Sequence, residues 1–198
     1  VYGFNVADFL RLAGVYLEVT IDNKIRVLIV NPNLDTAGSK YVVANILDGL
    51  DRSVFDPALG VYRRTYTALE AKVEQRTKIV ELPLRLPTRP YKYLPKRITD
   101  TARLLKDKYD ILHSFDYADS WSDVLAAKLA GAKCIVTKTN MNGGNRRWFL
   151  RSLFADWIVC LSNTQKRVLY RNRFWARKTN VINVGIDLAI FSPVDQLT

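Results

Sequence analysis

From residue 25 onward, short apolar segments alternate with segments of helical periodicity, and this alternation constrains the fold more than any other feature. The first apolar segment, IRVLIV at residues 25–30, is almost continuously apolar, as strands buried on both faces of a parallel sheet are. Residues 39–50 then carry apolar side chains at i, i+3 and i+4 spacing, which predicts a helix. Repeated units of this kind predict an α/β fold: a Rossmann-like, open, mostly parallel sheet with helices on both faces.

The same alternation continues along the chain. Further strands are predicted at residues 58–62, 78–82, 110–114, 133–137, 156–161 and 180–184. Further helices are predicted at residues 70–75, 97–108, 121–130, 148–154 and 164–170. The Asp56-Pro57 pair is predicted to form a turn, and the proline-rich residues 83–95 an irregular loop.

The two ends of the chain differ from this pattern. Residues 5–18 have the spacing of an amphipathic helix, which packs either on the sheet, on a partner domain, or on a membrane or another subunit. Residues 178–193, KTNVINVGIDLAIFSP, predict a strand, then a glycine turn, and then a proline that ends the segment. This pattern is typical of the connection between two domains. We therefore expect a helical extension at 1–23, one domain at 24–193 and a truncated interdomain linker at 194–198.

Composition places the chain among soluble globular proteins. Its 198 residues are 48% hydrophobic and 25% charged, enough for one domain with a sizeable core. The absence of an eighteen-residue apolar run predicts that no helix spans a membrane, and the first residues do not read as a secretory signal. Cys134 and Cys160 lie in apolar, strand-like segments, and two buried thiols without metal-site spacing favour a reducing compartment. We expect a cytoplasmic protein.

The net charge of +11 is concentrated after residue 60. Residues 61–110 carry 13 Lys/Arg against 6 Asp/Glu, and residues 111–198 carry 12 against 6. This excess favours an anionic partner: a phosphorylated substrate, an acidic membrane surface or nucleic acid. In residues 166–178, KRVLYRNRFWARK, basic and aromatic side chains alternate, a pattern that fits nucleic acid, acidic lipid or a solvated helix end. The sequence contains no recognised nucleic-acid-binding motif, which argues against nucleic acid as the partner.

Candidate site residues follow the predicted strands, because ligands of doubly wound sheets bind beyond the strands' carboxyl ends. Gly38 and Ser39 open the first helix, where free N–H groups and the helix dipole favour a phosphate, although the segment is neither a P-loop nor a G-x-G-x-x-G motif. His113, the only histidine, ends a strand close to Asp116, and we take both as candidate catalytic residues. One histidine excludes a multi-histidine metal site.

The loop after the fifth predicted strand, KTNMNGGNRR at residues 138–147, is polar, basic and rich in glycine. Such a loop suits substrate binding as well as a plain solvated connection. Its candidate acceptor-binding residues are Thr139, Asn140, Arg146 and Arg147. We expect no metal and no cofactor.

Four segments, taken together, resemble a known family. They are residues 25–50 (IRVLIVNPNLDTAGSKYVVANILDGL), 109–140 (YDILHSFDYADSWSDVLAAKLAGAKCIVTKTN), 154–169 (FADWIVCLSNTQKRVL) and 181–193 (VINVGIDLAIFSP). Their order and spacing resemble the N-terminal domain of GT-B glycosyltransferases, specifically the glycosyltransferase family 4 group.

The resemblance implies transfer of a sugar from a nucleotide-sugar to a glycan or lipid-linked acceptor without a required metal. It implies that Gly38 and Ser39 face the donor pyrophosphate and that Asp116, Thr139 and Asn140 line the acceptor side. It also implies that Ser162 caps a helix at the cleft. The nucleotide-sugar would bind mainly to a second, C-terminal domain, so these 198 residues alone are expected to be inactive.

The chain departs from the family pattern at several positions. Ala37 and Phe115 stand where the family often has a glycine and a histidine. Thr139 lies in the loop after the fifth strand, where the family commonly has a histidine, and Val184 replaces the family's asparagine in Pro-Asn-Gly. These departures leave a second hypothesis open: a degenerate transferase or flavodoxin-like domain that binds a protein or an anionic polymer without catalysis. Under the first hypothesis, the basic charge would hold a cytoplasmic enzyme against the anionic inner face of a membrane.

Overall fold

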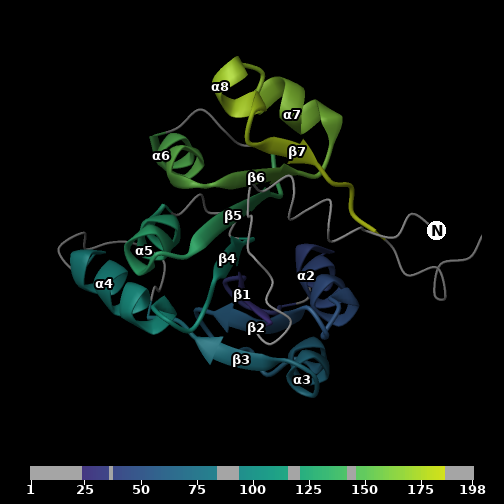
Figure 1. Cartoon of the computed structure of the whole chain (residues 1–198). Helices are drawn as coiled ribbons and strands as arrows, with labels where there is room; N and C mark the ends of the chain where they lie inside the picture. The colour runs from purple at the N-terminus through teal and green to yellow at the C-terminus, as the bar shows by residue number, and fades with distance from the viewer. Residues whose placement is uncertain (1–23, 36–37, 84–93, 116–120, 142–145, 186–198) are drawn as a thin grey trace, which may run out of the picture.

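In the computed structural model, seven parallel strands form a single sheet in the order β3-β2-β1-β4-β5-β6-β7 (Figure 1). The structure describes residues 24–35, 38–83, 94–115, 121–141 and 146–185. The strands are β1 (Ile25–Val30), β2 (Phe55–Val61), β3 (Lys78–Glu81), β4 (Ile111–Ser114), β5 (Lys133–Lys138), β6 (Trp157–Cys160) and β7 (Thr179–Val181). The helices are α2 (Gly38–Gly49), α3 (Ala68–Glu74), α4 (Leu94–Leu105), α5 (Ser122–Ala130), α6 (Arg146–Phe154), α7 (Asn163–Leu169) and α8 (Arg173–Ala176). The predicted Rossmann-like fold is confirmed.

The central strand β1 is buried on both faces of the sheet. Its even-numbered residues Leu28 and Val30 belong to one apolar core, which α4, α5, α6 and α8 cover. Its odd-numbered residues Val27 and Ile29 belong to a second core, which α2 and α3 cover. This two-sided burial explains why the segment is apolar at nearly every position.

The chain builds the sheet outward from β1 in two directions. It first adds β2 and β3 on one side of β1, and then returns to add β4 to β7 on the other side. The strand order therefore reverses between β1 and β4, which pair in register from Val27↔Ile111 to Val30↔Ser114. This reversal is the topological switch point of a doubly wound sheet.

Two local predictions were wrong, and one helix was missed. Asp56 and Pro57 lie inside β2 instead of forming a turn, and Pro57 is tolerated because β2 pairs with β3 only from Ala58 onward. Leu94 and Pro95 open α4 instead of ending a loop, since proline fits the first turn of a helix. The short helix α8, capped by Asn172, had not been predicted.

The predicted burial of both cysteines is confirmed. Cys134 and Cys160 are free and buried, and burial raises the pKa of both thiols, that of Cys160 to about 11. Among the residues that the structure describes, no helix has the length and apolar character needed to cross a bilayer. The predicted helix at 5–18 and the parts at 1–23 and 194–198 lie outside the described residues.

Candidate functional site

The carboxyl ends of β1 and β4 lie side by side at the switch point. The Phe115 backbone N–H donates to the Val30 carbonyl at 2.8 Å, which continues the ladder one residue past β4. From here the chain leads to α2 over one face of the sheet and to α5 over the other. The residues that follow the two strands therefore form the candidate site.

Gly38 and Ser39 open α2 beside this switch point, as the sequence predicted. Gly38 is exposed, and a side chain added there would meet no atom of the other described residues within 4 Å. Ser39 is half-buried. The first backbone N–H groups of a twelve-residue helix have no partner within the helix, and its dipole makes this end positive. This end of α2 therefore favours an anion.

A buried lysine that the sequence analysis missed lies in the first turn of α2. Lys40 is only 4% exposed, and its Nζ donates to Asn31 Oδ1 at 2.7 Å. Asn31, directly after β1, is 1% exposed, and its Nδ2 has no hydrogen-bond partner among the residues that the structure describes. The signal in the sequence was the spacing of Lys40 with Val43 and Leu47, which places all three on the buried face of α2.

His113 lies on β4 and is uncharged at neutral pH. Its Nε2 is 2.7 Å from Thr137 Oγ1 on the neighbouring strand, and its ring lies 4.5 Å from the Phe115 ring. Burial lowers the pKa of His113 to about 3, and the positive charge of Arg151 acts in the same direction. A nitrogen with this pKa is a weak base near pH 7, so His113 is suited to hydrogen bonding rather than to accepting a proton.

On the opposite face of the sheet, three buried polar side chains join β4, α5 and α6. Ser114 Oγ donates to Asp123 Oδ2 at 2.5 Å, and Arg151 Nη2 donates to Ser114 Oγ at 2.9 Å. All three residues are at most 2% exposed. Sequence analysis missed this cluster because its members are distant in the chain. The hydrogen bonds of this cluster hold the end of β4 to the start of α5. The predicted site residue Asp116 follows β4 in the sequence and lies outside the described residues.

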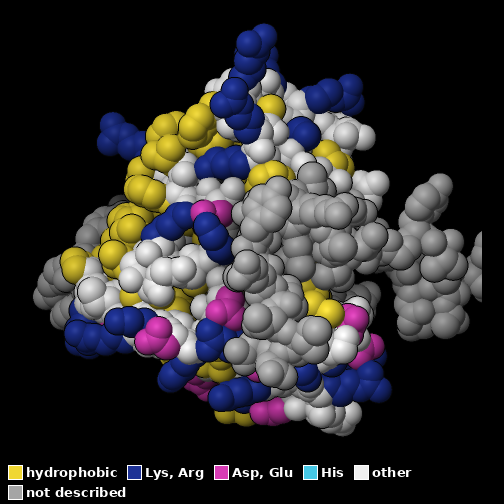
Figure 2. Space-filling view, viewed as in Figure 1, with side chains coloured by type: hydrophobic (Ala, Val, Ile, Leu, Met, Phe, Trp, Pro, Cys, Tyr) yellow, Lys and Arg dark blue, Asp and Glu magenta, His cyan; other side chains and the backbone are white. Residues whose placement is uncertain are grey.

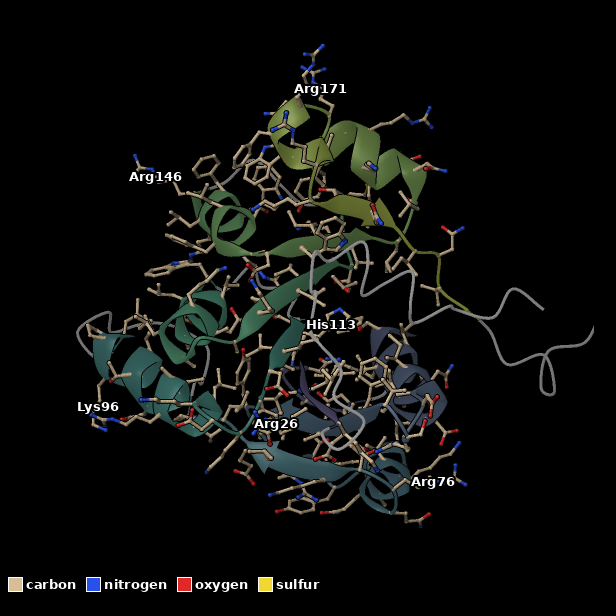
Figure 3. The ribbon with its side chains drawn as sticks, in the orientation of Figure 1. Arg26, Arg76, Lys96, His113, Arg146 and Arg171 are labelled. Atoms are coloured by element: carbon tan, nitrogen blue, oxygen red, sulfur yellow. The ribbon has the colours of Figure 1, made fainter. Side chains whose placement is uncertain are left out.

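The remaining predicted acceptor-binding residues lie at or near the carboxyl edge of the sheet. Thr139 and Asn140 are half-buried and directly follow β5. Ser162 caps α7 as predicted, since its Oγ accepts from the Gln165 N–H at 3.2 Å. Arg146 and Arg147 are exposed at the start of α6, and Figure 3 shows Arg146 pointing outward, away from His113 at the centre of the domain.

The loop between β2 and α3 is held rigid by one buried carboxylate, which sequence analysis also missed. Glu70 is 1% exposed, accepts from the Thr65 N–H at 2.8 Å and Oγ1 at 2.7 Å, and forms an ion pair with Arg64. Burial alone would raise the pKa of Glu70. The hydrogen bonds from Thr65 and the hydrogen bond and positive charge of Arg64 have a larger, opposite effect, so the pKa of Glu70 lies below its usual value. The loop holds Tyr66 at a φ of 54° with 81% of its surface exposed.

In the described part of this edge, metal-ligating residues do not gather. Within the described residues, no group of three or more His, Cys, Asp or Glu side chains could hold a metal ion. The polar groups found instead are backbone N–H groups, lysine, arginine, amides and hydroxyls. This set suits recognition of a phosphate or of sugar hydroxyls.

An open parallel sheet with a helix N-terminus at its switch point defines a Rossmann-like domain, and domains of this class bind their ligands at the carboxyl edge of the sheet. The model of Glycosyltransferase Family 4 matches residues 36–190, and the chain belongs to that family. No curated protein sequence matches the chain.

Solved glycosyltransferase structures share the fold. HepE from Anabaena, in complex with UDP and glucose, superposes with a TM-score of 0.65 at 14% identity over 84% of this chain and 46% of that one. A glycosyltransferase from Rickettsia africae gives 0.64 at 19% identity over 89% and 47% of the two chains. MurG from Acinetobacter baumannii gives 0.60 at 16% identity over 87% and 46%. The chain thus spans about half the length of these structures and matches their N-terminal, GT-B-type domains.

Proposed function

We propose that this chain is the acceptor-side domain of a cytoplasmic glycosyltransferase that moves a hexose from a nucleotide-sugar to a glycan or lipid-linked acceptor. The observation that carries the proposal is the family match over residues 36–190, together with the chain spanning about half of each matched structure. A second domain would bind most of the nucleotide-sugar. The 198 residues alone would then transfer no sugar, because both substrates must be held together.

In this proposal, the start of α2 faces the donor pyrophosphate. Gly38 allows close approach because its Cβ position is open, and Ser39 adds a hydroxyl beside the first N–H groups of the helix. Lys40 and Asn31 stand behind these groups and add positive charge and an amide donor. This arrangement supports binding of a diphosphate whatever sugar is attached to it.

The acceptor would lie along the ends of β4, β5 and β6. Thr139, Asn140 and Ser162 offer hydroxyl and amide groups there, and Asp116 follows β4 in the sequence. His113 contributes as a neutral group that fixes the Thr137 hydroxyl. Arg146 and Arg147 lie further out, where they would meet an anionic part of the acceptor or its surroundings.

Titration of the isotopically labelled chain with pyrophosphate, followed by amide NMR, tests this assignment. The amides of Gly38 and Ser39 are expected to shift, followed by those of Asn31 and Lys40. The amide of Lys78, at the opposite end of the sheet, serves as an internal control and is expected to stay unchanged. Uniform small shifts, or shifts confined to exposed arginines, would refute a phosphate site at α2 and favour a non-enzymatic module that binds anionic polymers.

A further inference from the structure

The loop between β2 and α3 presents one aromatic side chain to solvent in a backbone conformation that tyrosine rarely adopts. Tyr66 is 81% exposed and has a φ of 54°. A bulky residue at positive φ is strained, and such strain persists only where the surrounding structure imposes it. Packing in the core does not account for this residue, because most of its side chain lies in solvent.

The loop imposes this conformation through the buried carboxylate of Glu70. Its Oε2 accepts from the backbone N–H groups of Thr65 at 2.8 Å and Tyr66 at 3.3 Å, and from Thr65 Oγ1 at 2.7 Å. Arg64 pairs with the same carboxylate, and its guanidinium lies 5.4 Å from the centre of the Tyr66 ring. The ring is therefore held outward before a ligand arrives, which lowers the entropy that binding costs.

Polar side chains of the connection between β1 and α2 lie close to this ring. The two loops are joined where Thr67 Oγ1, directly after the tyrosine, donates to the Leu34 carbonyl at 2.8 Å. Asp35 directly follows Leu34 and is exposed. Its carboxylate accepts from Asn33 Nδ2 at 2.6 Å and lies 3.9 Å from the Arg63 guanidinium. The tyrosine thus has a carboxylate, an amide and a guanidinium nearby.

This combination of groups suits a neutral sugar ring. An aromatic ring offers an apolar surface to the C–H face of a sugar, and the polar side chains can bind its hydroxyl groups. A phosphate fits less well, because the Asp35 carboxylate would repel it. In Figure 2, acidic and basic side chains are mixed over the lower part of the molecule, around β3 and α3, whereas binding of a nucleic-acid strand requires an excess of basic ones.

We propose that Tyr66, Asp35 and Asn33 form a carbohydrate-binding subsite for a neutral sugar unit, separate from the acceptor edge at β4 to β6. The strands β2 and β4 lie on either side of β1, so their carboxyl ends are two strand spacings, or about 10 Å, apart. One sugar ring does not span that distance. The subsite would therefore hold a different sugar unit from the one that reacts, which favours a glycan of several units as the acceptor. The link to an acceptor rests on the proposed function, whereas sugar binding itself does not.

Titration of the isotopically labelled 198-residue chain with neutral oligosaccharides, followed by amide NMR, tests the subsite. Cellotriose, mannotriose and galactotriose are the probes. With at least one of them, the amides of Tyr66, Thr67 and Asp35 should shift. Tyr66→Asn should weaken this binding about tenfold because the stacking ring is lost, whereas Tyr66→Phe should keep it. Asp35→Ala should weaken it about fivefold, because a hydrogen bond to a sugar hydroxyl is lost.

Asparagine adopts positive φ more readily than most residues, so Tyr66→Asn removes the ring without adding strain. Its melting temperature should differ from that of the unchanged chain by less than about 3 °C. The matched control, Phe174→Ala, removes an exposed aromatic ring on α8 and should bind as the unchanged chain does. The proposal is overturned if none of the probes binds, if Tyr66→Asn binds as tightly as the unchanged chain, or if uridine shifts the same amides more strongly than the oligosaccharides.

Sugar transfer is measured separately, with the chain joined to a donor-binding domain, so the two proposals can fail independently. Oligosaccharide binding at Tyr66 without any transfer would remove the proposed function and leave the subsite. If the subsite holds part of the acceptor, Tyr66→Asn should raise the KM for a glycan acceptor and leave kcat unchanged. Transfer with an unchanged acceptor KM would remove the subsite from the acceptor site and leave the proposed function.

Discussion

The titration of His113 gives this domain a pH-dependent stability that one substitution should remove. The unfolded chain binds a proton at His113 with a pKa of about 6.5, whereas in the folded chain this pKa is lowered to about 3. Between these values the unfolded state binds more protons than the folded state. The stability contribution is therefore fully present above about pH 6.5 and is lost as the pH falls toward 3.

The size of the effect follows from the two pKa values. Between pH 7 and pH 5 the free energy of unfolding should fall by about 2 kcal/mol, approaching about 1.4 kcal/mol per pH unit at the lower end. His113 is the only histidine, so no other side chain of ordinary pKa titrates in this window. Carboxylates with lowered pKa values, such as Glu70 and Asp110, act mainly below pH 5.

Urea unfolding at pH 7 and pH 5, followed by tryptophan fluorescence, measures the effect. In His113→Gln, which keeps a hydrogen-bonding group opposite Thr137 without a titrating ring, the difference between the two pH values should shrink to a few tenths of a kcal/mol. An equal pH dependence in both proteins would refute the reasoning. It would mean that His113 is protonated as easily in the folded domain as in the unfolded chain.

Two further pairs of substitutions test the packing around the site. Glu70→Gln should lower the free energy of unfolding by about 3 kcal/mol, because it breaks a buried pair with Arg64. Glu74→Gln, which removes the exposed partner of the same arginine, should change it by less than about 0.5 kcal/mol, and equal effects in urea unfolding would contradict the burial argument. Gly131→Ala should lower the free energy of unfolding by about 1 kcal/mol, because Gly131 follows α5 at a φ of +79°. Gly49→Ala should raise it by about 0.5 kcal/mol, because Gly49 lies within α2 and its Cβ position is equally uncrowded. Thermal unfolding that shifts in the same direction for both glycine variants would refute this distinction.

The arrangement of the sheet was predictable because its signals are local. The apolar segment at Ile25–Val30 identifies a fully buried strand without reference to the rest of the chain, and the structure has the same bounds. Gly38 and Ser39 were located in the same way, from a glycine at the start of a helical pattern. The turn predicted at Pro57 failed because tolerance of proline there depends on which neighbouring strand pairs with β2, a property of the sheet rather than of the segment.

The buried charges were not predictable by the same means. Lys40 and Arg151 belong to residue types that local patterns assign to solvent, and their burial depends on partners brought together only by folding. Arg151 meets Ser114 from 37 residues away, and Lys40 meets Asn31 across a connection between β1 and α2. The short helix α8 escaped prediction because its four residues hold only one buried side chain, Trp175.

We propose above that this chain is the acceptor half of a glycosyltransferase. The most direct test compares sugar transfer from UDP-glucose, UDP-N-acetylglucosamine and GDP-mannose by two proteins: the 198-residue chain, and the same chain followed by a donor-binding domain. A membrane extract serves as acceptor, and incorporation of labelled sugar is measured. We expect transfer by the two-domain protein and none by the chain alone. Robust transfer by the chain alone would contradict it, and so would the absence of transfer by a two-domain protein that binds its nucleotide-sugar.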